Sequence, residues 1–194
     1  EGDAPVSLHA ARLEEEQKAY EAKRAEEEKQ RMLEYSEPGD ETAETEDAVF
    51  LLHQEPGYGS DYWGISGIIV RGSELTIPSE LNGHKILAVF NNARVTGDDK
   101  LKTLTVEEGI QSIGIMAFAY ARNLETLTLP GSVTGIGMYA FNGCRSLKQV
   151  TLPPALGIDS IAEQAFGGCG LEDITLGDGT SLMAASLEAY RRTG

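Results

Sequence analysis

A glycine-rich segment in the second half of the chain has the spacing of a cofactor-binding loop. Residues 135–140, Gly-Ile-Gly-Met-Tyr-Ala, match the pattern that holds the pyrophosphate of a dinucleotide, and Asp159 follows about 20 residues later. The same phase returns at residues 112–117 and 160–165, and no helix of crossover length follows it. We therefore interpret the match as one phase of an internal repeat, and we expect no bound cofactor.

The histidines and the acidic residues do not form the patterns of a metal site or an acid–base pair. The histidines are scattered over three segments, at His9, His53 and His84. None belongs to an H-E-x-x-H motif or to a Cys/His cluster. The acidic pairs at 98–99 and 107–108 are neighbours in turns, whereas acid–base catalysis needs facing carboxylates with separated pKa values. The nucleophile motif G-x-S-x-G is also absent. We predict no enzyme and no metal site, and a weak calcium site at these acidic turns stays open as an alternative.

Two cysteines, Cys144 and Cys169, are too few for a disulfide framework. Each lies three residues after a repeated Phe, at a position where another repeat has Ala121. We therefore expect both to be buried, where an apolar environment raises the pKa of a thiol and makes it a poor nucleophile. Stacked turns bring them within disulfide range, but parallel side chains favour two free thiols. Both states stay open.

The elements that position these residues belong to one repeat, which returns every 23 or 24 residues. Each unit begins with L-x-x-L-T-L or a close variant, at residues 101–106, 124–129, 147–152 and 171–176. A second signature, Ile-x4-Phe, follows at residues 113–118, 136–141 and 161–166. A fixed period of this length indicates a solenoid, in which each unit buries its apolar side only against its neighbours. We expect Phe118, Phe141 and Phe166 to stack in the core.

The intervening positions of each L-x-x-L-x-L segment are expected to be exposed, since the leucines point inward from a short strand on the concave face. They form three columns across neighbouring turns. The first column contains Lys102, Glu125, Lys148 and Glu172. The second contains Thr103, Thr126, Gln149 and Asp173. The third contains Thr105, Thr128, Thr151 and Thr175, preceded by Thr76. We predict that a ligand binds to these columns.

Each column also has a structural interpretation. β-Branched residues suit strands, and stacked threonines stabilise sheets. The alternation of Lys and Glu in the first column is most simply charge pairing within the protein, which contributes little when exposed. The functional interpretation is a hydroxyl-lined groove for a polar chain, such as a glycan or an extended peptide.

The acidity of the chain is concentrated before the repeats. Residues 1–56 carry 17 acidic and 6 basic residues, which is −11 of the formal net charge of −15. This balance argues against nucleic acid and against docking on anionic membranes, and no apolar run is long enough to span a bilayer. Residues from about 5 to 35 are rich in Glu, Ala, Lys and Arg, which predicts a long charged helix. The acidic run at 40–47 predicts a flexible linker.

The segment between this linker and the first full repeat has the composition of β-strands. The apolar residues from 48 to 52 and from 62 to 70 predict two strands, which would cover the open end of the solenoid. At the other end, residues 177–190 have the spacing of a degenerate last repeat. The predicted domains are a charged helix with an acidic linker at 1–47, a cap at 48–74 and the solenoid at 75–194.

The full pattern L-x-x-L-T-L-P-x-x-[VL]-x-x-I-x-x-x-A-F-x-x-C resembles the BspA-like, Treponema-type leucine-rich repeats of bacterial surface proteins. Residues 124–146 and 147–170 match it closely, and the resemblance covers about residues 60–180. It implies a leucine-rich-repeat solenoid of about 4–5 turns, with short parallel strands on the concave face and irregular or short helical turns on the convex face. A β-rich N-terminal cap and the long charged helix would precede it.

The resemblance also implies a function class. It suggests an extracellular or cell-surface module for adhesion or binding, without catalysis, whose partner is an extracellular protein or a glycan. The competing hypothesis is a structural spacer or self-association unit of a larger envelope protein. Because the chain lacks an initiator Met, we expect a trimmed or mature fragment; no signal peptide is visible in it, and trimming would have removed one. Ligand identity, surface anchoring and oligomeric state stay open.

Overall fold

The computed structural model describes residues 4–55, 57, 59, 61–97, 99–154, 156, 161–175 and 181–183. The chain divides into two compact units, Glu1–Ser36 and Glu37–Gly194. The first unit is helical and the second contains all of the described strands.

The first unit is the helix α1 (Ala4–Leu33), which confirms the predicted charged helix. Exposed ion pairs one turn apart line its surface, with Arg12 Nε 2.8 Å from Glu16 and Arg24 Nε 3.0 Å from Glu28. Its large apolar side chains do not form a buried stripe, since Tyr20 is 65% exposed. The helix therefore depends on intrinsic propensity and on i,i+4 pairs. In the described part of the chain, no helix has the length and apolar character needed to cross a lipid bilayer.

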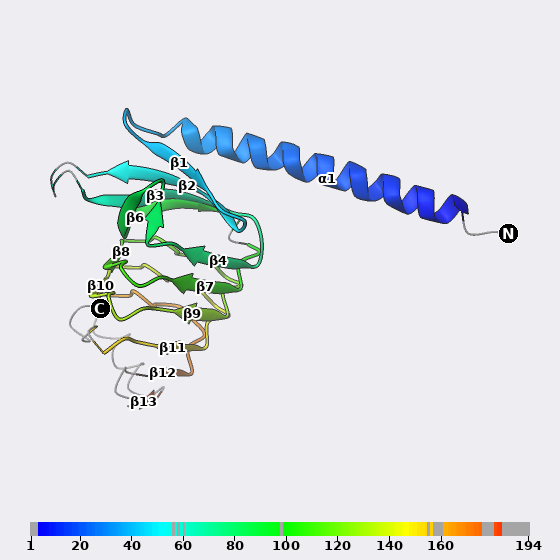
Figure 1. Cartoon of the computed structure of the whole chain (residues 1–194). Coiled ribbons are helices and arrows are strands. Elements are labelled where there is room, and N and C mark those ends of the chain that lie inside the picture. Colours follow the sequence, from blue (N-terminus) through cyan, green and yellow to red (C-terminus); the bar gives the residue numbers. More distant parts are fainter. Residues whose placement is uncertain are drawn as a thin grey trace. The chain divides into compact units, whose positions relative to one another are not determined.

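The second unit contains two β-sheets that enclose one apolar core (Figure 1). The cap sheet has seven described strands: β1 (Glu41–Glu44), β2 (Ala48–Gln54), β3 (Trp63–Val70), β6 (His84–Thr96), β8 (Ser112–Ile113) and β10 (Gly135–Ile136) in spatial order, with β5 (Glu80–Leu81) paired to β6. The Thr sheet has six: β4 (Glu74–Ile77), β7 (Thr103–Val106), β9 (Thr126–Thr128), β11 (Gln149–Thr151), β12 (Asp173–Thr175) and β13 (Ser181–Met183). From β4 to β11 the chain passes back and forth between the two sheets, and a bridge from Ile161 to Ile136 precedes β12; this is the predicted solenoid.

The Thr sheet keeps one register from β4 to β12. The strands are parallel, and the central apolar residues align as Leu75, Leu104, Leu127, Val150 and Ile174. All five of these side chains are buried. Because side chains alternate across a strand, this register places the Thr columns on the opposite, solvent-facing side.

The predicted aromatic column forms the centre of the core. The rings of Phe118 and Phe141 lie 5.7 Å apart, and those of Phe141 and Phe166 lie 5.3 Å apart, each pair within 7° of parallel. Cys144 and Cys169 are buried and are not bridged to each other. Their thiols donate to the backbone oxygens of Phe118 and Phe141, at 3.4 and 3.1 Å. The expectation that both cysteines are buried thiols, not bridged to each other, is therefore confirmed.

The glycine pattern at 135–140 serves close contact between turns. A Cβ on Gly137 would lie 2.6 Å from the backbone nitrogen of Ile115, and a Cβ on Gly114 would lie 2.5 Å from the carbonyl carbon of Phe90. Two-residue strands and hydrogen-bonded turns form this side of the solenoid. The structure therefore supports the interpretation of the dinucleotide-like pattern as repeat phase.

The cap differs from its prediction at its first strand. The acidic run 40–47, expected as a flexible linker, contains β1, which pairs antiparallel with β2. Ala43 is buried opposite Phe50, and the Asp40 carboxylate, 4% exposed, lies 2.7 Å from Nδ1 of His53. The linker prediction was wrong here because local composition does not report pairing with a distant strand. The other predicted boundaries, at 48–74 and 75–194, remain predictions.

The C-terminal prediction is tested at only one place. Within the expected degenerate repeat at 177–190, the structure describes β13, which runs antiparallel to β12. This direction is opposite to that of the repeat strands before it. The remaining residues of 177–190 lie outside the described part of the chain.

Candidate binding groove

The predicted columns lie side by side on the Thr sheet. Partners in register are Thr103, Thr126, Gln149 and Asp173 in one column, and Thr76, Thr105, Thr128, Thr151 and Thr175 in the next. Thr126, Thr128, Gln149 and Thr151 are exposed, whereas Thr103, Thr105 and Thr175 are half-buried. For Asp173 the structure describes the backbone alone. The most accessible part of the columns is therefore the pair of central strands, β9 and β11.

The first column pairs its charges internally. Nζ of Lys102 lies 3.5 Å from Glu125, and Nζ of Lys148 lies 3.1 Å from Glu172. All four side chains are more than half exposed, so solvent screens both pairs and each contributes little to stability. The pairs support the structural interpretation of this column.

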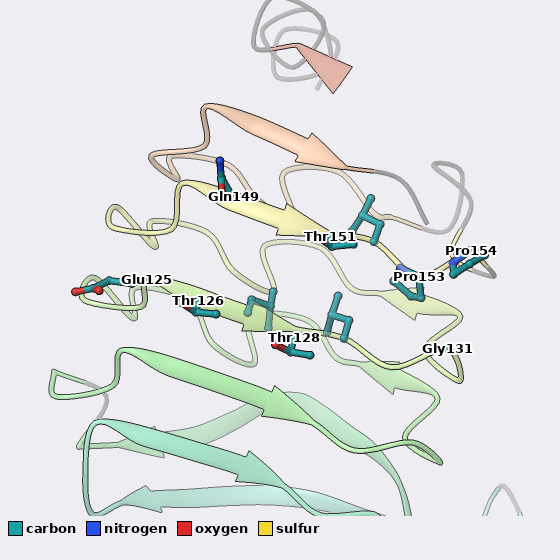
Figure 2. A pocket seen from close by; sticks show the side chains of 11 residues that line it. Glu125, Thr126, Thr128, Gly131, Gln149, Thr151, Pro153 and Pro154 are labelled. Atoms are coloured by element: carbon teal, nitrogen blue, oxygen red, sulfur yellow. The ribbon is translucent and has the colours of Figure 1, made fainter. Parts of the chain in front are cut away.

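A groove of about 560 Å³ follows the two central strands (Figure 2). Its lining consists of Glu125, Thr126, Leu127, Thr128, Leu129, Gly131, Gln149, Thr151, Leu152, Pro153 and Pro154. Figure 2 shows Thr126 and Thr128 on one strand and Thr151 on the next, with Glu125 at one end and Pro153 and Pro154 at the other. The polar side chains of the strands are thus exposed in the channel, whereas the leucines of its lining are buried.

The groove contains five of the twelve predicted binding residues, which are Glu125, Thr126, Thr128, Gln149 and Thr151. Among the described residues, its lining does not include Lys102, Thr103, Thr105, Lys148, Glu172, Asp173 or Thr175. The other lining residues were not predicted as binding residues: Leu127, Leu129, Gly131, Leu152, Pro153 and Pro154. The proline that follows the strand in L-x-L-P was the available signal, because proline cannot continue the ladder and turns the chain toward the rim.

The family comparison agrees with this geometry. The family described as BspA type Leucine rich repeat region matches residues 87–189, in six copies of its repeat. The chain belongs to this family. None of the curated proteins matches the chain.

Two solved structures share the fold of this BspA-type repeat protein. A leucine-rich repeat protein from Bacteroides capillosus ATCC 29799 is 20% identical, with a TM-score of 0.56 over 70% of this chain and 97% of that chain. A leucine-rich repeat protein from Bacteroides ovatus ATCC 8483 is 26% identical, with a TM-score of 0.55 over 71% of this chain. The match spans only 36% of the ovatus chain.

The acidic turn of this repeat protein holds neighbouring turns together. Oε2 of Glu107 accepts hydrogen bonds from the backbone nitrogen and hydroxyl of Ser79, at 2.9 and 3.2 Å. Oε2 of Glu108 accepts from the backbone nitrogen of Gly131, at 3.0 Å, beside the groove. Among the residues that the structure describes, no three His, Cys, Asp or Glu side chains are grouped to hold a metal ion. Asp98, of the other acidic turn for which the calcium alternative stays open, lies outside the described residues.

Two of the three histidines of the repeat protein join strands of the cap. Nε2 of His84 lies 3.2 Å from Glu41, and its ring stacks on Trp63 at a centroid distance of 3.9 Å. A hydrogen bond from Asn82 and the contact with His84 hold the pKa of Glu41 below its usual value. These contacts fasten β1 to the β5–β6 hairpin and give the histidine a structural role.

Proposed function

We propose that this chain is a non-catalytic binding module of a secreted or surface-exposed bacterial protein, and that the groove on β9 and β11 takes a protein or glycan ligand. The groove carries the proposal, because exposed polar side chains line it and the exposed Pro154 borders it. Small numbers of placed polar groups in an apolar channel are typical of binding sites. The net charge of −15 fits a partner other than nucleic acid.

The size of the Thr sheet limits the affinity of one module. Its five parallel strands, spaced about 4.8 Å apart, span about 20–25 Å. A strip of that length and about 15 Å wide offers about 300–400 Å², whereas a standard stable interface buries about 800 Å² per partner. We therefore expect binding weaker than nanomolar for one copy and a strong gain from multivalent display.

A second candidate function is a spacer or self-association unit of a larger envelope protein. The internal pairs Lys102–Glu125 and Lys148–Glu172 favour it, since they use charges that a binding face would offer to a partner. Concentration-dependent association of the chain in sedimentation velocity, without any ligand, would favour this candidate.

The test is a screen with the chain displayed in many copies on beads, against arrays of glycans and extracellular-matrix proteins. Thr128→Lys combined with Thr151→Lys places two long charged side chains in the groove and should abolish a specific signal. Thr134→Lys is the matched control, because Thr134 is exposed and lies outside the groove lining. Far-UV circular dichroism of each variant checks that the fold is intact. A signal that survives the double substitution would refute the groove as the site.

A further inference from the structure

We propose that the groove takes an extended peptide segment that carries a lysine or arginine, in preference to a glycan or an anionic ligand. This inference rests on the proposed function and names the chemical class of its ligand. Three properties of the groove support it: the groups that its lining lacks, the hydrogen-bonding groups that it offers, and the charge at its two ends.

The lining lacks the groups that sugars and anions need. Among the described residues, no Phe, Tyr, Trp or His lines the groove, so it offers no flat ring on which the apolar face of a sugar could stack. No Lys or Arg lines it either, so a phosphate, sulfate or carboxylate would meet no cation there. Both ligand classes would depend on the Thr hydroxyl groups and the Gln149 amide.

The groups that are present match the needs of an extended peptide. A Thr hydroxyl and the Gln149 amide can each donate and accept, which suits alternating backbone N–H and C=O groups. The exposed Pro154 supplies an apolar contact for a side chain of the ligand, whereas Leu129, Leu152 and Pro153 are themselves buried. From Glu125 to Leu129, around β9, the groove follows four residue steps of the chain, so at about 3.3 Å per residue it accommodates about four extended residues.

Charge at the ends of the groove selects a basic side chain. At the proline end, the carboxylate of Glu108 lies against Gly131, and its described hydrogen bond comes from a neutral backbone N–H. At the other end, the carboxylate of Glu125 lies 3.5 Å from Nζ of Lys102 in an exposed ion pair, so Lys102 partly compensates its charge. In the described structure, the negative charge of Glu108 is therefore less compensated by a neighbouring cation than that of Glu125. A lysine or arginine of the ligand that binds at the proline end of the groove would lie beside Glu108.

The face of the Thr sheet is favoured over strand addition at a sheet edge. At the cap end, the edge strand of the Thr sheet is β4 and that of the cap sheet is β1, and the backbone of each already bonds to a side chain. Oδ2 of Asp47 accepts from the backbone nitrogen of Thr76 on β4, at 3.1 Å. Nδ2 of Asn82 donates to the backbone oxygen of Thr42 on β1, at 3.1 Å. Strand addition by a peptide needs free backbone groups at an edge, so these two contacts oppose it.

The experiment compares two arrays probed with the full chain in multivalent form. One array carries synthetic decapeptides in which a single central position is Lys, Glu, Gln or Leu, and the other carries neutral oligosaccharides. We expect the Lys peptides to bind most strongly. Glu108→Gln should lower their affinity about two- to fivefold, the range for one exposed charge pair, and should leave the Gln peptides unchanged. Glu163→Gln is the charge-matched control, since Glu163 is exposed and lies outside the groove lining.

Each result separates the inference from the proposed function. Peptide binding without a preference for Lys, or without an effect of Glu108→Gln, overturns the inference. Oligosaccharide binding that Thr128→Lys with Thr151→Lys abolishes, together with silent peptides, also overturns it but leaves the proposed function standing. If neither array binds, the inference fails, and the proposed function is then decided by the screen against extracellular-matrix proteins and glycans.

Discussion

The repeats and the cap are held together by different kinds of contact. In the repeats, one parallel register passes from strand to strand, and like side chains stack on like side chains, as Phe141 does on Phe118 and Phe166. In the cap, β2 and β3 are antiparallel and shift register near Leu51, and polar side chains such as Asp47 join distant segments. The repeats thus depend mainly on stacked apolar side chains, with hydrogen bonds from turn to turn at Glu107 and Glu108, whereas the cap also contains a carboxyl, Glu41, whose pKa is lowered by its partners.

The largest effect should come from the aromatic column. Phe141→Ala removes a fully buried ring that packs between two others, and we expect a loss of about 4 kcal/mol in the free energy of unfolding. Urea unfolding followed by circular dichroism measures this loss. The fluorescence of Trp63, the one tryptophan of the chain, reports separately on the cap.

Phe166→Ala is the control for this prediction. Phe166 is 8% exposed, and its described ring contact lies on one side only, so its removal should cost less. Equal losses for the two variants would show that ring stacking between turns does not determine the stability of the repeats.

A somewhat smaller effect is expected where the backbones of two turns meet. Gly137→Ala places a Cβ 2.6 Å from the backbone nitrogen of Ile115, which cannot move without separating the turns. We expect a loss of about 2–3 kcal/mol from this overpacking, measured by the same unfolding experiment. Gly135→Ala is the matched control two residues away, because its Cβ would meet nothing within 4 Å. A neutral Gly137→Ala would show that the turns can separate freely.

The cap should respond to acid through Glu41. Hydrogen bonds from Asn82 and His84 lower the pKa of this carboxyl in the folded state. Its contacts therefore stabilise the cap at pH values above the usual pKa of Glu, which is about 4.3. This contribution is lost as the pH falls through the lower pKa of the folded state. Since the side chain is 40% exposed, we expect an effect below about 1 kcal/mol.

This expectation is tested with Glu41→Gln. The stability advantage of the unsubstituted chain over Glu41→Gln should shrink between about pH 6 and about pH 3 in urea unfolding followed by Trp63 fluorescence. Glu74→Gln, which removes an exposed carboxyl from β4, is the charge-matched control. An advantage that stays constant or grows toward low pH would contradict the assigned role.

The smallest effect is expected on the surface of the repeats. A double-mutant cycle on Lys148→Ala and Glu172→Ala should give a coupling energy of about 0.2–1 kcal/mol, because both side chains are well exposed. Added salt should reduce the coupling further. A coupling above this range would show that the charged column stabilises the repeats as strongly as a polar contact of the cap.

The repeats could be predicted from sequence because their determinants are local and recur. Each L-x-x-L-T-L segment specifies its own strand, and the spacing from one Phe to the next specifies the core column. The strand β1 could not be predicted in this way. Its acidic residues resemble a linker, and its structure depends on the register with β2 and on the contact between Asp40 and His53.

The candidate groove was predictable only in part. Exposure of Thr128 and Thr151 follows from the alternation of side chains in a strand. The rim depends on where Pro153 and Pro154 direct the chain after the strand ends, and on the contact of Glu108 with the next turn. These features follow from the path of the connecting segments, which the repeat period does not specify.

The two buried cysteines can be used to measure the opening of the repeats. The thiols of Cys144 and Cys169 are hydrogen-bonded to the preceding turns and closed off from solvent, so a thiol reagent reaches them only while turns are apart. The labelling rate of each cysteine then measures how often the turns around that cysteine separate. Comparing the two rates would show whether the solenoid frays from its C-terminal end or opens as a whole, without adding any foreign label site.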